Sequence, residues 1–245
     1  MSGHSKWKNI MHKKAKTDAQ RAKIFTKIGK EMCVAVKDGG ADPNTNSKLK
    51  DLIAKAKSFN VPNDNIERII KKASGSDDIN YENINYEGYG PSGVAVIVEC
   101  MTDNRNRTSG DVKHYFDKYG GNLGATGCVA YLFTDRGVMI IDADGIDEDK
   151  LMEDVLEAGA TDFSKEDGEN DGEYVYEIFT PPTTLSAVSA NLEKAGYKFL
   201  SSEVDKIPST YVKLDSDDDI AKMDKLIELL EDNDDVLNIW HNLID

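Results

Sequence analysis

Residues 17–75 carry a hydrophobic pattern with the period of an α-helix, whereas residues 1–17 are polar and basic and show no such stripe. From Thr17 onward, large apolar side chains recur three or four residues apart until Asp38–Gly40 interrupts the run. Two further runs follow, one after Pro43 and one from Asn63. The apolar positions of the three runs are Phe25, Ile28, Met32 and Val36, then Leu49, Leu52, Ile53, Ala56 and Phe59, then Ile66, Ile69, Ile70 and Ala73. Because such helices bury their stripes against one another, the pattern predicts a small helical bundle.

The pattern changes after the third run. Residues 74–93 are rich in Gly, Ser, Asn and Asp, which is typical of a linker. The β-branched run 94–100 then predicts a buried strand, and residues 129–133 predict a second one. Between them, Thr108 and Asp111 have the spacing of a capping box and predict a helix. This part of the chain is therefore expected to form a β-α-β unit.

Residues 137–204 predict a complete β-α-β-β-α-β unit, which is the ferredoxin-like order. Its expected elements are a strand at 137–142, a helix at 147–159, strands at 161–165 and 173–179, a helix through 185–192 and a strand at 199–204. The end of the chain predicts a strand at 210–214, a helix at 220–230 and a strand at 236–243. These last three elements supply what the first β-α-β unit lacks, so an insertion of one domain into the other is the economical arrangement.

We therefore predict an α+β, multidomain chain, in which an N-terminal basic three-helix domain is followed by two ferredoxin-like α/β domains, one inserted in the other. The expected limits are 1–76 for the basic N-terminal arm and helical bundle, 77–134 plus 208–245 for the split α/β domain, and 135–207 for the inserted acidic α/β domain.

Charge is distributed unevenly along the 245 residues. The net charge is −15 and the isoelectric point is about 4.7. Residues 1–76, however, contain 17 Lys and Arg against 7 Asp and Glu, whereas residues 137–245 contain 8 against 29. An acidic chain as a whole argues against a polyanionic partner, but the basic N-terminal part argues for one at that end.

Composition also bears on location. The three cysteines are far apart and form no C-x-x-C pair, which disfavours a disulfide framework and structural zinc. The longest apolar runs have the length of a strand and fall short of the roughly 18 residues that a membrane-spanning helix needs. The first residues are basic with no apolar segment behind them, so no signal peptide is expected. We expect a cytoplasmic protein without a membrane partner.

The basic N-terminal segment is the strongest chemical signal. Cations that neutralise phosphates release counterions, which gives affinity for nucleic acid without sequence specificity. Trp7 lies among these cations, where it would stack on a base. The alternative is a solvated charged arm with Trp7 packed on the bundle. The cations of this segment chosen as candidate nucleic-acid contacts are Lys6, Lys8, Lys13, Lys14, Lys16, Arg21 and Lys23.

A second candidate lies at residues 102–108. Arg105 and Arg107 are two residues apart, between a strand end and a helix start, where they would suit a phosphate or a carboxylate. The alternative is a loop held by ion pairs to acidic neighbours such as Asp103 and Asp111. Composition does not decide between the two.

Other motifs predict no chemistry. The glycine-rich segment 120–127 lacks the Lys and hydroxyl residues of a phosphate loop and precedes a strand, so we interpret it as a turn. Residues 142–153 imitate a calcium loop, but the glycine is misplaced. The histidines do not form a metal motif, and no nucleophile turn is present. We expect no enzyme activity, no cofactor, no metal site and no small-molecule substrate.

Several segments together resemble the YebC family, which also includes the mitochondrial translational activator of cytochrome c oxidase. They are GHSKW at 3–7, KIFTK at 23–27, DNIERIIKKASG at 64–75, YEGYGPSGVAVIVECMTDNRNRT at 86–108 and GGNLG to GCVAYLF at 120–133. The resemblance runs through the whole chain and is densest up to residue 133. It implies a basic helical domain followed by two α/β domains, and a non-enzymatic regulator of gene expression in the cytoplasm. It also implies nucleic-acid contact at His4, Lys6, Trp7, Arg105 and Arg107.

Two functions remain open on these grounds. Family members are usually described as probable transcriptional regulatory proteins that bind DNA. Others are treated as ribosome-associated factors that aid translation, notably at proline runs, and these would contact rRNA or tRNA. The basic segment contains more Lys than Arg, which favours contact with the backbone over reading of bases. A nucleic-acid-binding regulator is the prediction, with DNA first and the ribosome as the alternative.

Overall fold

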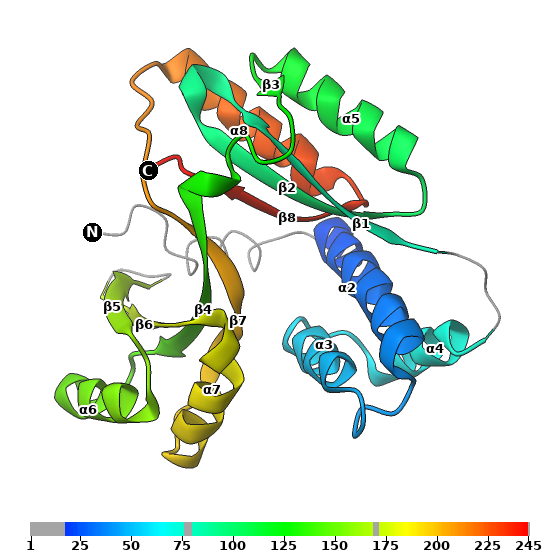
Figure 1. Ribbon diagram of the computed structural model, residues 1–245. Coiled ribbons are helices and arrows are strands. Elements are labelled where there is room, and N and C mark those ends of the chain that lie inside the picture. Colours follow the sequence, from blue (N-terminus) through cyan, green and yellow to red (C-terminus); the bar gives the residue numbers. More distant parts are fainter. Residues whose placement is uncertain (1–17, 76–79, 169–171, 245) are drawn as a thin grey trace. The chain divides into compact units, whose positions relative to one another are not determined.

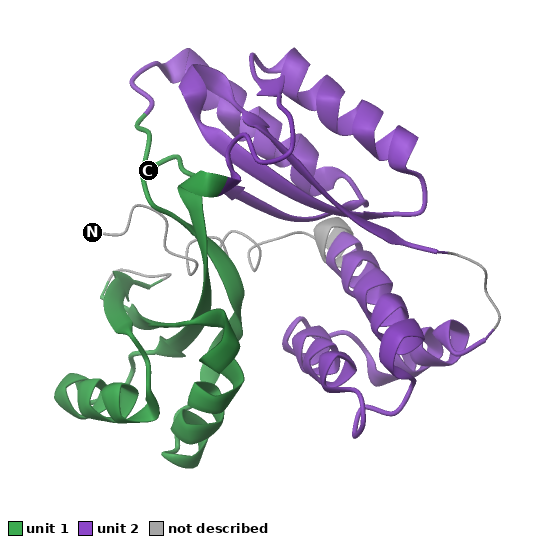
Figure 2. Cartoon of the chain, viewed as in Figure 1, with its two compact units in different colours: residues 1–15, 131–213, 242–245 green, residues 16–130, 214–241 purple. Residues whose placement is uncertain are grey.

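The computed structural model describes residues 18–75, 80–168 and 172–244, with side chains from Ala22 onward. The described residues form two compact units, one of residues 18–130 and 214–241 and the other of residues 131–213 and 242–244 (Figure 2). The first unit contains a helical bundle and a sheet, and the second contains another sheet (Figure 1). In these ranges no helix combines the length and the apolar character needed to cross a membrane.

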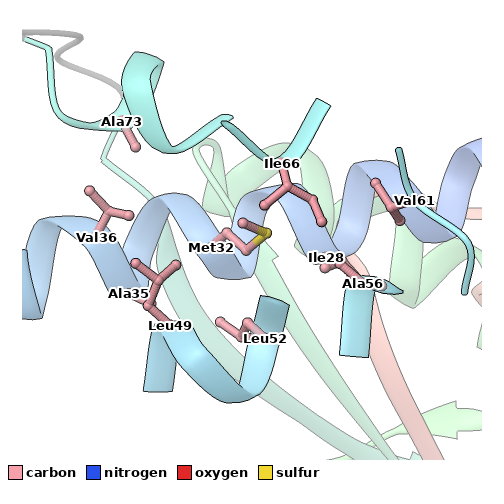
Figure 3. Close-up of a cluster of buried hydrophobic side chains, with 10 residues drawn as sticks. All are labelled: Ile28, Met32, Ala35, Val36, Leu49, Leu52, Ala56, Val61, Ile66 and Ala73. Atoms are coloured by element: carbon pink, nitrogen blue, oxygen red, sulfur yellow. The ribbon is translucent and has the colours of Figure 1, made fainter. Parts of the chain in front are cut away.

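The helical bundle consists of α2 (Asp18–Gly39), α3 (Ser47–Ser58) and α4 (Asn63–Ala73). The long helix α2 contacts both shorter helices, and the three apolar stripes meet in one core (Figure 3). The buried residues of this core are Ile28, Met32, Ala35, Val36, Leu49, Leu52, Ala56, Val61, Ile66 and Ala73. All thirteen predicted apolar positions are in this core or packed against it as half-buried side chains, so the bundle follows the sequence pattern closely.

A buried asparagine joins the end of α2 to the start of α3. The Asn46 side chain accepts a hydrogen bond from the Leu49 amide at 3.0 Å, which caps α3. Its amide group donates to the carbonyl oxygens of Ala35 at 2.7 Å and Gly40 at 2.8 Å. One side chain therefore satisfies backbone groups at both helix ends and fixes the turn between them.

The sheet of the first unit has the strand order β3-β1-β2-β8, with every neighbouring pair antiparallel. Helices α5 and α8 contact each other and the strands of this sheet, and Figure 1 shows both on one face. The chain order is β-β-α-β, followed after the second unit by α-β. The elements are β1 (Glu82–Tyr89), β2 (Ala95–Thr102), α5 (Arg105–Lys118), β3 (Asn122–Leu123), α8 (Asp217–Asp232) and β8 (Val236–His241).

The sheet of the second unit has the order β5-β6-β4-β7 and is also antiparallel. Its chain order is β-α-β-β-α-β, as the sequence predicts, and the strand order is the ferredoxin-like one. Its apolar core lies between the sheet and helices α6 and α7 and includes Met139, Leu151, Tyr176 and Leu192. The elements are β4 (Phe133–Asp142), α6 (Glu148–Ala158), β5 (Asp162–Asp167), β6 (Tyr174–Thr180), α7 (Leu185–Lys194) and β7 (Phe199–Pro208).

The α+β class with a helical region and two four-stranded sheets is confirmed, but three local predictions were wrong. The segment 74–93, predicted as a linker, contains strand β1, which pairs with β2 over its whole length although most of its residues are polar. Residues 130–132 form a 3₁₀ turn instead of a strand. Residues 210–214 contribute only one bridge, between Val212 and Leu243.

The start of α5 also differs from the expected one. The helix begins at Arg105, and its N-cap is Asn104, whose side chain accepts from the Arg107 amide at 3.1 Å. The capping box of Thr108 and Asp111 was therefore wrong by one turn, because Thr108 is inside the helix and is fully buried. The domain limits expected from the sequence stay a prediction.

Candidate nucleic-acid interface

The predicted nucleic-acid residues fall into three groups. His4, Lys6, Trp7, Lys8, Lys13, Lys14 and Lys16 lie outside the described residues. Arg21 lies in α2, but its side chain is outside the described part. The structure places the side chains of the remaining three, Lys23 in α2 and Arg105 and Arg107 in the first turn of α5.

Lys23 belongs to a row of three lysines along α2. Lys23, Lys27 and Lys30 are four and three residues apart and therefore share one face of the helix. At 100° per residue this face lies opposite the stripe of Ile28, Met32 and Ala35 that enters the bundle core. The row is thus outside the bundle interior, and it contacts the end of α8 in the same unit instead.

We call the partner of this row the α8 terminus, defined as residues 231–235. Lys23 Nζ donates to the main-chain oxygen of Asp232 at 3.0 Å and to its carboxylate at 2.8 Å. Lys27 Nζ donates to the main-chain oxygen of Glu231 at 2.7 Å. Lys30 Nζ donates to the main-chain oxygen of Asp234 at 2.9 Å. Lys23 and Lys27 therefore satisfy carbonyls in the last turn of α8, where cations are favoured by the helix dipole, and Lys30 satisfies one just beyond it.

Asp235 is the centre of the polar contacts in this region. Its carboxylate accepts from Lys30 at 2.7 Å and from Arg107 at 2.7 Å. It also accepts from the Thr108 hydroxyl at 2.9 Å and the Thr102 hydroxyl at 3.1 Å. The side chain is only 6% exposed. One carboxylate thereby joins α2, α5 and the end of β2, which makes it a structural residue of the first unit.

The protonation of Asp235 reflects these contacts. Burial alone would raise the pKa of its carboxyl group, because the charged form loses hydration. Hydrogen bonds from Lys30, Arg107 and Thr108 outweigh burial and lower the pKa from 3.8 to about 2. The carboxylate is therefore charged across the physiological range.

The two arginines of the 102–108 segment have different environments. Arg107 makes ion pairs with Asp103 at 2.9 Å and with Asp235 at 2.7 Å, which corresponds to the ion-paired alternative at this loop. Its side chain nevertheless stays 47% exposed. Arg105 is exposed on the first turn of α5. A phosphate contact at these two residues stays a prediction.

A set of cations outside the predicted list lies on the two short helices of the bundle. Lys50 and Lys57 share the outward face of α3, and Arg68 and Lys71 lie on the outward face of α4. All four are exposed. Within the described residues, Lys50, Lys57 and Lys71 make no ion pair, whereas Lys55 on the same helix lies 3.6 Å from Glu31. The sequence indicated these cations as Lys-rich outer faces of the helices. It did not distinguish exposed lysines from lysines that pair with acidic residues of the protein.

The glycine-rich segment binds a carboxylate of the protein itself. The buried Glu87 of β1 accepts hydrogen bonds from the backbone amides of Gly127 at 2.8 Å, Val129 at 3.0 Å and Ala130 at 2.8 Å. Amides arranged in this way suit an anion. Because Glu87 already supplies that anion, the loop functions as a turn that holds the chain where β3 ends.

The arrangement on the bundle can bind phosphates as point charges. Lysine ammonium groups recognise negative oxygen atoms without the fixed two-pronged geometry of arginine, so they favour backbone contact. The second unit has the opposite character, with exposed acidic residues on both the helices and the loops, such as Asp149, Glu153 and Glu157 on α6. Such a surface repels polyanions.

Comparison with known proteins identifies the family. Residues 5–76 match the family model described as the TACO1/YebC protein N-terminal domain, and residues 81–243 match the TACO1/YebC second and third domain. A relative from Acetivibrio thermocellus is 57% identical over 99% of this chain and 98% of its own. A relative from Finegoldia magna is 54% identical over the same shares. Both carry the name "probable transcriptional regulatory protein".

The fold has a counterpart among solved structures. The crystal structure of a conserved hypothetical protein from Aquifex aeolicus aligns with a TM-score of 0.81 and 42% sequence identity. The alignment covers 94% of this chain and 92% of that one. Two matched family models, relatives above 50% identity and a shared fold all agree, and the chain belongs to the TACO1/YebC family.

Proposed function

We propose that this protein is a nucleic-acid-binding regulator of gene expression that contacts the phosphate backbone through its basic N-terminal part. The observation that carries the proposal is the set of exposed lysines on the outer faces of α3 and α4, in a chain whose first residues are also rich in lysine. The names of the relatives support transcription as the process that is regulated. DNA is the partner that such a regulator would bind. The protein acts in the cytoplasm and without catalysis in this proposal.

A second candidate function is favoured by one observation. Of the four exposed cations named on α3 and α4, three are lysines, and such cations read the backbone rather than the bases. A factor that binds structured RNA on the ribosome needs this kind of contact and does not need sequence specificity. A ribosome-associated translation factor, acting for example at proline runs, is therefore the alternative.

The test compares wild type with two triple variants of equal charge change. In the arm variant, Lys13, Lys14 and Lys16 are replaced by Glu. In the control variant, Lys113, Lys222 and Lys225 are replaced by Glu; these are exposed lysines on the sheet side of the first unit that already have acidic partners. Sedimentation of lysate through a sucrose gradient separates ribosome-bound from unbound protein. Anisotropy of labelled DNA and RNA duplexes measures affinity for each.

Each function gives a distinct result. Sedimentation of wild type and control with ribosomes, while the arm variant stays at the top, supports translation. Binding of duplex DNA by wild type and control but not by the arm variant, with no ribosome association, supports transcription. The proposal is overturned when wild type binds neither duplex nor ribosomes, or when the arm variant binds as tightly as wild type.

A further inference from the structure

The lysine row of α2 has the chemistry of a phosphate-binding surface, yet its partners are internal. Its three ammonium groups donate to three main-chain oxygens and to the carboxylates of Asp232 and Asp235. These acceptors form a line of negative or partly negative oxygen atoms along the helix face. A nucleic-acid backbone presents the same kind of line to a basic helix.

The two ends of the row differ in strength. Lys30 and Asp235 are 13% and 6% exposed, and Asp235 is also held by Arg107 and Thr108. A buried pair of this kind is costly to break. Lys23 and Asp232 are 35% and 49% exposed, and an exposed pair contributes little to stability. The contact thus has one fixed end, at Lys30, and one weak end, at Lys23.

In the sequence, the weak end is also the end nearest the basic N-terminal segment. Lys23 is five residues into the described part of α2, and five lysines precede it in residues 1–17. A polyanion bound by that segment would reach Lys23 first and Lys27 next. The phosphates of the polyanion, which has a high charge density, would compete with the α8 terminus for these two lysines.

We propose that the α8 terminus is an internal phosphate mimic, which competes with nucleic acid for Lys23 and Lys27 while the Lys30–Asp235 pair holds α2 in place. The inference rests on the proposed function and describes its regulation. Bound nucleic acid takes over Lys23 and Lys27, so Glu231 and Asp232 lose their lysine contacts while Lys30 keeps its contacts with Asp234 and Asp235. In the free protein, a polyanion of low affinity does not bind Lys23 and Lys27, because it must first displace the contacts that these lysines make with the α8 terminus.

The experiment uses two matched variants of the full chain. Asp232→Asn removes the carboxylate that holds Lys23, whereas Asp234→Asn makes the same charge change at an exposed side chain two residues away that forms no ion pair within the described residues. Anisotropy of labelled DNA and RNA duplexes gives the affinity of each. We expect Asp232→Asn to bind about threefold to fivefold more tightly than Asp234→Asn, which is the effect of removing one exposed competing pair. Adding Lys23→Gln to Asp232→Asn should abolish that gain.

Hydrogen exchange provides a second readout that a purely structural contact would not change. The Asn233 amide donates to the Leu230 carbonyl at the end of α8. A saturating duplex should speed exchange in the peptide that covers residues 226–236 of wild type, because the lysines no longer hold this end. Protection of the α5 peptide should stay constant.

The outcomes separate this inference from the function on which it rests. When wild type binds duplexes, equal affinity of Asp232→Asn and Asp234→Asn together with unchanged exchange overturns the internal competitor and leaves the proposed function intact. When no duplex binds to wild type or to either variant, the proposed function itself fails. A selective gain in Asp232→Asn with faster exchange at residues 226–236 supports the inference.

Discussion

The lysines of α2 and those of α3 and α4 look alike in the sequence and differ in the structure. Lys23, Lys27 and Lys30 are half-buried and donate to the α8 terminus, whereas Lys50 and Lys57 of α3 are exposed. Both sets lie on the side of their helix that faces away from the bundle core. The difference is that an acidic helix end covers one set. A basic helix face is therefore available to a polyanion only when no internal carboxylate already occupies it.

The largest expected effect concerns the fixed end of the covered row. Asp235→Ala would leave Lys30 and Arg107 without their shared carboxylate and would remove an acceptor from the hydroxyls of Thr102 and Thr108. Breaking a buried pair in this way costs roughly 3–5 kcal/mol. Urea denaturation should show this loss in the free energy of unfolding. Asp234→Ala is the control and should change it by less than about 0.5 kcal/mol; equal losses would show that Asp235 is not the centre of this region.

Acid should weaken the same contact. The folded-state pKa of Asp235 is lowered to about 2 from 3.8. A group with a depressed pKa stabilises the fold above its unfolded value, and that contribution is lost as the pH falls toward the folded value. The shift corresponds to roughly 2 kcal/mol, lost between about pH 4 and pH 2. Melting curves across this range should show a drop that is much smaller in Asp235→Asn; an identical drop in both proteins would contradict the assignment.

The exposed lysines of α3 and α4 should contribute most of the affinity of the protein for a nucleic-acid duplex. Changing Lys50, Lys57 and Lys71 to Glu should lower duplex affinity by about tenfold or more and reduce the salt slope by about three, because each phosphate contact contributes close to one. The measurement is anisotropy at several salt concentrations. The triple variant of Lys113, Lys222 and Lys225 carries the same charge change on the sheet side and is the control. Equal losses of duplex affinity in the two triple variants would show that net charge, and not the position of the lysines, determines binding.

The hydrophobic pattern determined most of the fold. The three bundle helices and all six elements of the second sheet follow from apolar spacing, because each element buries one face locally. Strand β1 was missed because most of its residues are polar and it has no apolar run of its own, although it pairs with the next strand, β2, over its whole length. Residues 210–214, which form only one bridge, were predicted as a strand because a short apolar run does not show whether a partner strand exists.

The candidate site was harder to predict for a different reason. Basic residues are easy to find in a sequence, but their availability depends on carboxylates about 200 positions away, as for Lys23 and Asp232. One signal did exist. Residues 231–235 place four acidic side chains at the C-terminal end of a helix, where the dipole disfavours negative charge. Such a run at a helix end requires nearby cations, and the lysines of α2 supply them.

The smallest expected effect is on stability at the weak end of the covered row. Lys23 and Asp232 are exposed enough that Asp232→Asn should lower the free energy of unfolding by at most about 1 kcal/mol. The same substitution is expected to raise duplex affinity, so stability and affinity should move in opposite directions. Asp235 variants should instead lose stability first, with any change in affinity following from unfolding. Parallel urea denaturation and anisotropy on both variants measure this contrast. A loss of several kcal/mol in Asp232→Asn would mean that the whole row is structural, and the division into a fixed and a weak end would be wrong.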